Sequence, residues 1–293
     1  MTDARTITLA LKGKWHGHYG TCFCPAHANT RTPALSVTSG DDGRVLTYCH
    51  AGCDFRAVLD ALRGLGLIEG RGTYTPPSVA DLARIRAAED EQAAKQETYA
   101  RNLWRETVPI EGTIAETYLR NRAITCELPG TLRFHPDCRH PTGKRFPAMV
   151  ALIEGATRLA VHRTYLRPDG VGKAQVDPPK AMLGACAGGA VRLTGAGNRL
   201  VVCEGLETAL SLACGLVRGP VTIWAALSTS GMKGLILPAS PGPLIVATDG
   251  DVPGRAAGLS LAQRAYSTGW NVSMLAAPDG EDWNDVVRGM VAA

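Results

Sequence analysis

The sequence predicts a multidomain protein of the α+β and α/β classes, with a small ribbon module, a mixed α+β module and a parallel sheet. Three observations predict this class. The 293 residues suffice for about two domains of ~150 residues and some smaller pieces. Four of the nine cysteines crowd into residues 22–53. The C-terminal third alternates apolar strand-like runs with helical patterns, as parallel βαβ units do when helices cover both faces of a sheet.

The composition is that of an ordinary soluble globular protein, with 45% apolar and 20% charged residues. It excludes a disordered, collagen-like or coiled-coil chain, and the net charge of +4 is too small for a polycation. No apolar run reaches the roughly 18 residues that span a membrane, and the N-terminus lacks the features of a secretory signal. We therefore expect a cytoplasmic protein with reduced cysteines and no contact with a membrane.

The N-terminal part divides into a module and a connection. We expect residues 1–70 to form a ribbon domain of short extended pieces that ends in a helix over about 56–65. Residues 71–105 are expected to hold a linker and a connecting helix. Two glycines and paired prolines exclude a helix over 70–78. The Ala-, Glu- and Arg-rich stretch that follows, to about Thr107, predicts a polar helix.

Residues 106–195 predict a mixed α+β module that carries a positive charge. Strand-like runs over 148–154 and 159–166 are separated by turns rich in Pro and Gly. Twelve Lys and Arg face eight Asp and Glu in this segment, whereas residues 196–293 carry six and eight. A basic module beside an acidic one suits an enzyme that acts on a polyanion.

Residues 196–293 predict the parallel sheet. Four apolar runs have the length and β-branched content of buried strands: 200–204, 221–227, 243–249 and 271–277. Helical patterns lie between and after them: 207–216, 231–237, 254–269 and 282–290.

The crowded cysteines indicate a metal site. Cys24 and His27 form one close pair, and Cys49 and Cys53 form another after 21 intervening residues. Zinc takes four such ligands in a tetrahedron, commonly as two close pairs, and a small module buries too little apolar surface to be stable without it. We therefore predict one structural zinc ion. Either Cys22 or His50 is an alternative to one member of a pair.

Acidic residues follow the predicted strands. Glu204 ends the first strand, Asp249 and Asp251 follow the third, and Asp282 follows the fourth. Because the carboxyl ends of parallel strands share one edge, these side chains are expected on one rim. Mg²⁺ or Mn²⁺ would offset their repulsion and bridge to substrate phosphates. Asp-Gly after a strand also makes simple turns, but acidic residues after several strands of one sheet favour the metal site. The pattern of a P-loop is absent from the sequence.

Two sets of motifs resemble those of bacterial and phage DNA primases. CPAHANTRTPALSV followed by YCHAGC is similar to the primase zinc ribbon, and CEGLETA, TDGDVPGRAA and GEDWND are similar to the motifs of the primase Toprim domain. HRTYLRPDG and DPPKAMLG resemble the basic N-terminal part of the primase catalytic core. The resemblance covers nearly the whole chain except residues 71–105. It is closest to compact primase-like proteins of phages and mobile elements that lack a helicase.

The resemblance implies a function and roles for residues. The chain would synthesise short RNA primers on a single-stranded DNA template from NTPs, beside a separate replicative helicase. The zinc ligands would be Cys24, His27, Cys49 and Cys53. The catalytic residues would be Glu204, Asp249 and Asp251, which with Asp282 would bind Mg²⁺, while roles for Glu207 and Asp285 stay open. Nucleic-acid or nucleotide phosphates would be bound by Arg163, Lys173 and Lys180.

Two other functions compete with this interpretation. A Toprim nuclease would use similar carboxylates with water as the nucleophile, and a non-catalytic accessory protein would only bind single-stranded DNA. The zinc module and the basic middle module favour the primase. The presence of Glu204, Asp249 and Asp251 speaks against a protein that only binds.

Overall fold

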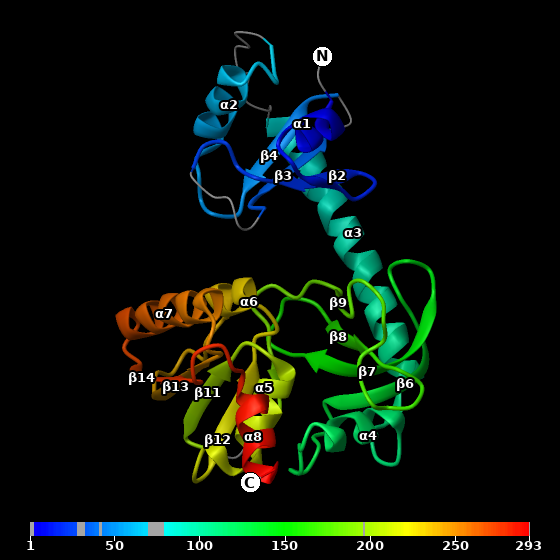
Figure 1. The fold of residues 1–293 in the computed structure, drawn as a ribbon, viewed down its shortest axis with the longest axis vertical. Coiled ribbons are helices and arrows are strands. Elements are labelled where there is room, and N and C mark those ends of the chain that lie inside the picture. Colours follow the sequence, from blue (N-terminus) through cyan, green and yellow to red (C-terminus); the bar gives the residue numbers. More distant parts are fainter. Residues whose placement is uncertain (1–2, 28–32, 41–42, 70–78, 196, 293) are drawn as a thin grey trace. The chain divides into compact units, whose positions relative to one another are not determined.

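The protein consists of two compact units, Met1–Ser78 and Val79–Ala293. The structure is a computed structural model (Figure 1), and it describes residues 3–27, 33–40, 43–69, 79–195 and 197–292. The linker predicted over 70–78 lies outside these residues. Within them, the structure contains no helix that combines the length and the apolar character needed to cross a membrane.

The first unit is an antiparallel sheet of four strands in the order β1-β2-β3-β4. Its elements are α1 (Ala4–Ala10), β1 (Lys14–Trp15), β2 (Tyr19–Cys22), β3 (Leu35–Ser39), β4 (Val45–Cys49) and α2 (Phe55–Gly64). One face of the sheet packs with both helices around Leu35 and Val37. The predicted helix is confirmed as α2. Helix α1 was not predicted, although Asp3 caps it by accepting a 2.7 Å hydrogen bond from the Thr6 N–H.

The second unit begins with an antiparallel sheet in the order β5-β6-β7-β8-β9. Its elements are α3 (Val79–Glu106), β5 (Val108–Pro109), α4 (Ile114–Asn121), β6 (Leu132–Arg139), β7 (Arg145–Ile153), β8 (Ala160–Tyr165) and β9 (Lys180–Leu183). The predicted strands over 148–154 and 159–166 are confirmed as β7 and β8. We therefore find the expected mixed α+β architecture in this part of the chain.

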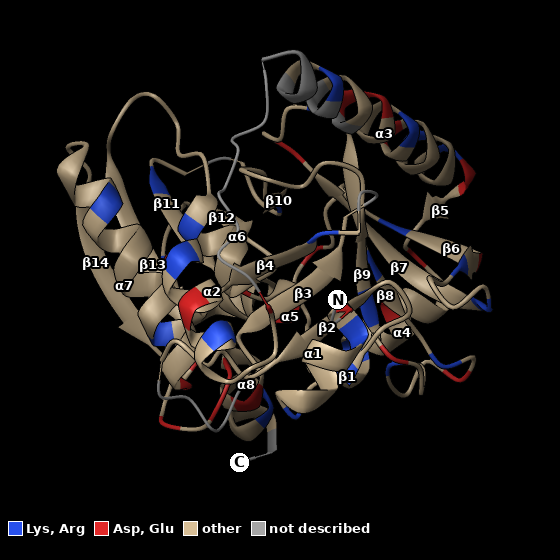
Figure 2. Cartoon of the chain, turned by 90° about the horizontal axis from the view of Figure 1, so that it is seen from above, with Lys and Arg blue, Asp and Glu red and all other residues tan. Residues whose placement is uncertain are grey.

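Helix α3 is polar, as predicted, and acidic and basic stretches alternate along it (Figure 2). The C-terminal part of α3 also packs against the antiparallel sheet of the second unit. Ala100 is fully buried, and Leu103 and Trp104 pack beside it against the apolar face formed by residues such as Val161 and Tyr165. The end of α3 is therefore part of the core of the second unit.

The second unit continues with the predicted parallel sheet, in the order β10-β12-β11-β13-β14. Its elements are β10 (Val191–Arg192), β11 (Arg199–Cys203), α5 (Leu206–Ser211), the π-helical turn η1 (Leu212–Leu216), β12 (Val221–Ala225), α6 (Thr229–Gly234), β13 (Pro243–Thr248), α7 (Val252–Ser267), β14 (Asn271–Ala276) and α8 (Trp283–Ala292). Strands β11 to β14 pair in parallel, and β10 adds an antiparallel edge that was not predicted. Helices α6 and α7 cover one face, and α5 and α8 cover the other (Figure 1).

Two expectations for this sheet were wrong in detail. β14 is an edge strand and not a buried one, because only β13 pairs with it, and Met274 is 47% exposed. The helix predicted over 207–216 also changes form within its length. It passes from α5 into η1, where Gly215 adopts a φ of +103° that favours glycine.

Candidate zinc site and acidic rim

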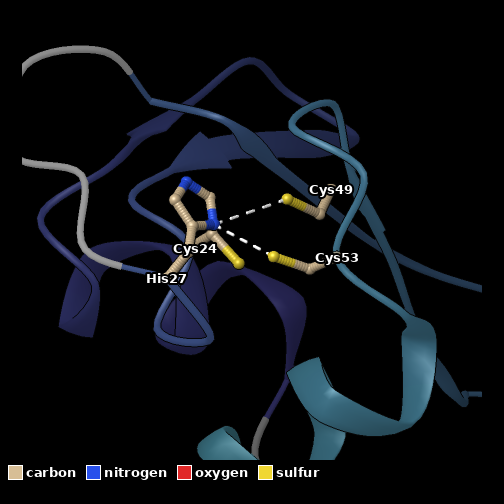
Figure 3. Close-up of side chains that lie close together, drawn as sticks. All are labelled: Cys24, His27, Cys49 and Cys53. Atoms are coloured by element: carbon tan, nitrogen blue, oxygen red, sulfur yellow. Dashed lines mark hydrogen bonds between the residues drawn. The ribbon is translucent and has the colours of Figure 1, made fainter.

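The predicted zinc ligands come together in the first unit. Cys24, His27, Cys49 and Cys53 place their ligand atoms within 4.8 Å of one another (Figure 3). The Nδ1 atom of His27 lies 3.1 Å from the Sγ atom of Cys53 and 3.8 Å from that of Cys49. A tetrahedral zinc ion separates a nitrogen from a sulfur ligand by about 3.5 Å, a value between these two distances. The donor set and its spacing therefore fit a structural zinc ion.

The two alternative ligands point elsewhere. Cys22 is fully buried in the core of the first unit, and its Sγ atom lies 3.7 Å from the carbonyl oxygen of Leu35. The Nε2 atom of His50 is 2.8 Å from the Oγ atom of Ser36. Neither side chain belongs to the cluster of four.

The sheet of the first unit has an exposed face opposite its core. The strand register places Tyr19, Thr38 and Leu46 in one row across this face, and Tyr48 in the next row. Tyr48 is 67% exposed, Leu46 50% and Tyr19 42%. The ring of His16 stacks on Tyr19 at 4.9 Å between centroids. We call this surface the ribbon face; its exposed rings offer stacking partners for unpaired bases.

The acidic residues follow the strands of the parallel sheet as predicted. Glu204 comes directly after β11, and Asp249 directly after β13, so both lie at the carboxyl edge. Thr208 donates a 3.1 Å hydrogen bond to Asp249, and Asp251 caps α7 by accepting a 2.7 Å bond from the Gly254 N–H. These bonds fix the direction of the two aspartates at the rim.

The last acidic segment is also fixed by capping. Asp282 accepts 2.8 Å hydrogen bonds from the N–H groups of Asn284 and Asp285 at the start of α8. Asp285 in turn accepts from the Asp282 N–H at 3.2 Å. This reciprocal arrangement gives Asp285 a structural role in the helix start.

Burial and mutual repulsion disfavour the charged forms of two carboxylates at the rim. Burial raises the pKa of Glu204, and the charges of Asp249 and Asp251 raise it further. Burial also raises the pKa of Asp249, together with the charges of Asp282 and Asp251 and against the hydrogen bond from Thr208. A bound divalent cation would relieve this repulsion. Among the described residues, the cluster of Cys24, His27, Cys49 and Cys53 is the one group of three or more potential ligands whose ligand atoms all lie close together.

The loops that carry the rim residues are held together at Gly250. The Gly250 N–H donates to the Glu281 carbonyl at 2.8 Å, and the Gly280 N–H donates to the Gly250 carbonyl at 3.1 Å. A Cβ atom on Gly250 would overlap the carbonyl oxygen of Pro278. The approach of two main chains therefore requires glycine here.

We expect Gly250→Ala to lower the free energy of unfolding by roughly 2 kcal/mol, because the added methyl group forces the loops apart. Urea unfolding measures this. Gly289→Ala is the matched control, since nothing lies within 4 Å of a Cβ atom there and alanine favours the helix. Equal stability of the Gly250 variant and the wild type would show that the loops tolerate separation.

The three predicted basic residues have different surroundings. Lys173 and Lys180 each place Nζ 3.0 Å from a carboxylate oxygen of Glu207. Arg163 is 6% exposed and donates to the main-chain carbonyls of Arg139 and Met182 at 3.0 and 3.1 Å. This engagement speaks against a phosphate contact by Arg163.

Sequence reasoning missed three side chains that shape the site. Tyr118 donates to Glu207 from 89 positions away, and no local signal indicates that contact. Trp283 donates through Nε1 to the Thr248 carbonyl at 3.1 Å, which fixes α8 against the end of β13. Thr208 lies four residues after Glu204, in the first turn of α5, and this spacing is a signal that was available.

Comparisons with known families identify the C-terminal part. Residues 199–292 match the profile of the Toprim domain, and residues 94–193 match that of a domain of unknown function, DUF7146. The residues that match the Toprim profile are those of the parallel sheet from β11 onward and its helices. No curated protein matches the sequence significantly.

Several solved structures are similar in part. The zinc-binding and RNA polymerase domains of the Aquifex aeolicus primase match with 14% identity and a TM-score of 0.42, over 99% of this chain and 80% of that one. The RNA polymerase domain of the Mycobacterium tuberculosis primase matches with 16% identity and a TM-score of 0.39, over 69% and 83%. A DNA primase domain from Pseudomonas aeruginosa matches with 19% identity and a TM-score of 0.34, over 53% of this chain. The match covers about half, 52%, of the Pseudomonas chain.

Proposed function

We propose that the chain is a primase-like nucleotidyltransferase that synthesises short RNA primers on single-stranded DNA. The observation that carries this proposal is the Toprim domain whose Glu204 and Asp249 lie at one edge, in the same compact unit as Lys173 and Lys180. Acidic groups that bind metal and basic groups that bind phosphate are the two requirements of nucleotidyl transfer. A separate helicase would supply the single-stranded template.

In the proposed reaction the 3′-hydroxyl oxygen of one nucleotide attacks the α-phosphorus of an incoming NTP. A new P–O bond forms, the bond to the β-phosphate oxygen breaks, and pyrophosphate leaves. Mg²⁺ or Mn²⁺ held by Asp249 and Asp251, with Asp282, would stabilise charge on the phosphates. Glu204 either joins these ligands or accepts the hydroxyl proton, and its raised pKa brings it closer to the working pH of a base.

Incorporation of labelled nucleotides on unprimed single-stranded DNA tests the function, with Mg²⁺ or Mn²⁺ and with Glu204→Gln beside the wild type. Short products that vanish in the variant and persist in Glu281→Gln, a neighbouring exposed carboxylate, support the primase. Cation-dependent loss of the template would instead identify a nuclease. Binding of single strands without either reaction would identify an accessory protein.

The ribbon face is the proposed contact for template bases. We expect Tyr48→Ala to weaken binding of single-stranded DNA by about tenfold, because stacking on one aromatic ring contributes roughly 1–3 kcal/mol per base. Fluorescence anisotropy with a labelled oligonucleotide measures the change. Tyr99→Ala, at a 61% exposed tyrosine on α3, is the control and should bind normally. Normal binding by the Tyr48 variant would place the template elsewhere.

A further inference from the structure

Glu207 is the centre of a buried charge cluster beside the rim. It is 5% exposed, and its carboxylate accepts from the hydroxyl of Tyr118 at 2.8 Å and lies 3.0 Å from the ammonium groups of Lys173 and Lys180. The partners come from α4, from the loop before β9 and from β9 itself. Both oxygens of Glu207 are therefore occupied by donors of the antiparallel sheet module.

The cluster has more positive than negative charge. Burial alone would raise the pKa of Glu207, but the charges of Lys180 and Lys173 and the hydrogen bond from Tyr118 lower it below its usual range. One carboxylate thus faces two ammonium groups. An ammonium group has three donors, so each lysine keeps two after its bond to Glu207. The side chains of Lys173 and Lys180 are 28% and 37% exposed, so a ligand can reach part of each side chain.

Negative charge near the cluster comes from the rim, where the charge of Asp282 acts on Tyr118. His162 on β8 is buried, and burial followed by the charge of Lys180 lowers its pKa to about 4, so the ring is neutral at pH 7. Two arginines add positive charge nearby: the charge of Arg122 acts on Lys173, and the charge of Arg163 acts on His162. Toward the rim, the charge of Lys180 acts on Glu204 and Asp249, the groups proposed to bind metal.

We propose that Glu207 is a positioning residue that holds Lys173 and Lys180 together as a clamp for the phosphates of a nucleoside triphosphate. The inference rests on the proposed function, and it gives Glu207 a role different from that of a metal ligand. Because each lysine takes its own oxygen of one carboxylate, Glu207 sets the spacing of the two ammonium groups. Without it, their mutual repulsion would separate them.

The direction in which ATP affinity changes in one variant separates this positioning role from a simple effect of charge. Glu207→Gln raises the net charge of the cluster by one unit, so charge alone predicts tighter binding of ATP with Mg²⁺. The positioning role predicts the opposite, about tenfold weaker binding, because displaced donors no longer match the phosphates. Equilibrium dialysis of labelled ATP without template measures this. Glu116→Gln, which breaks an exposed pair with Arg120, is the matched control.

Two further variants show whether Glu207 acts through the lysines. In the wild type, Lys180→Ala should weaken ATP binding, whereas in the Glu207→Gln background the same change should add little. Tyr118→Phe removes one hydrogen bond from Glu207 without a change in charge, and should weaken binding by about threefold. This variant keeps the test available if Glu207→Gln does not fold. Additive effects of the two charge variants, or unchanged binding by Tyr118→Phe, would overturn the proposal.

Kinetics complete the test. If the chain makes primers, Glu207→Gln should raise the KM for NTP about tenfold, with a smaller change in kcat. Weaker ATP binding in the variant, with no primer synthesis by the wild type, would refute the primase and keep the clamp. Primer synthesis with equal ATP affinity in both proteins would refute the clamp alone. A wild type that does not bind ATP would also refute it.

Discussion

Replacing Asp249 and Asp251 together by Asn is expected to reduce nucleotide incorporation about a thousandfold or more, because the cation proposed to stabilise the phosphate charge would lose two ligands. The fold should persist. Asn caps a helix as well as Asp does, so α7 keeps its start at position 251. Burial and neighbouring carboxylates also raise the pKa of Asp249, so a neutral side chain there relieves repulsion. Incorporation on unprimed single-stranded DNA measures the loss.

Thermal unfolding separates loss of metal from loss of structure. Millimolar Mg²⁺ should raise the Tm of the wild type, because a ligand that binds only the folded state stabilises it. The double variant should fold with a normal zinc content but show no such increase. Asp279→Asn removes a neighbouring carboxylate that pairs with Arg255, and it should behave as the wild type does. Synthesis by the double variant would mean that the metal site lies elsewhere.

The zinc cluster and the acidic edge could be predicted for a shared reason, because short-range sequence features determine each of them. Cys24 and His27 are close in sequence, as are Cys49 and Cys53, and the pairing of β3 with both β2 and β4 brings the two pairs together. Glu204 and Asp249 follow β-branched apolar runs, and parallel pairing alone places the ends of such strands at one edge.

Contacts between distant segments could not be predicted in this way. Tyr118 and Glu207 are joined only because α4 packs against the α5 face of the parallel sheet, and nothing in either segment specifies that packing. The order of the strands in the parallel sheet could not be predicted from the sequence either. The run at 271–277 has the composition of a buried strand, and its place at the edge depends on which strands pair. The sequence therefore indicated the acidic groups, with Glu207 among them, and two lysines, but not that Glu207 pairs with both lysines.

Loss of the zinc ion is the second large effect that we expect. A structural zinc site contributes about 10–16 kcal/mol to the folding of small zinc modules, more than a core the size of the first unit supplies. Cys53→Ser should therefore reduce the zinc content from one ion per chain to nearly none. Cys53 is only partly buried, so the loss of packing is small and the effect reports on the metal. Atomic emission measures zinc, and proteolysis should begin within the first unit.

Cys22→Ser is the matched control, because it makes the same chemical change two residues before Cys24. The Cys22 sulfur lies in the core beside the Leu35 carbonyl, outside the cluster of four. This variant should keep one zinc ion and lose only packing energy. In both variants the second unit should keep its own unfolding transition, since its core contains none of the zinc ligands. Full zinc in the Cys53 variant together with none in the Cys22 variant would mean that Cys22, and not Cys53, is the zinc ligand.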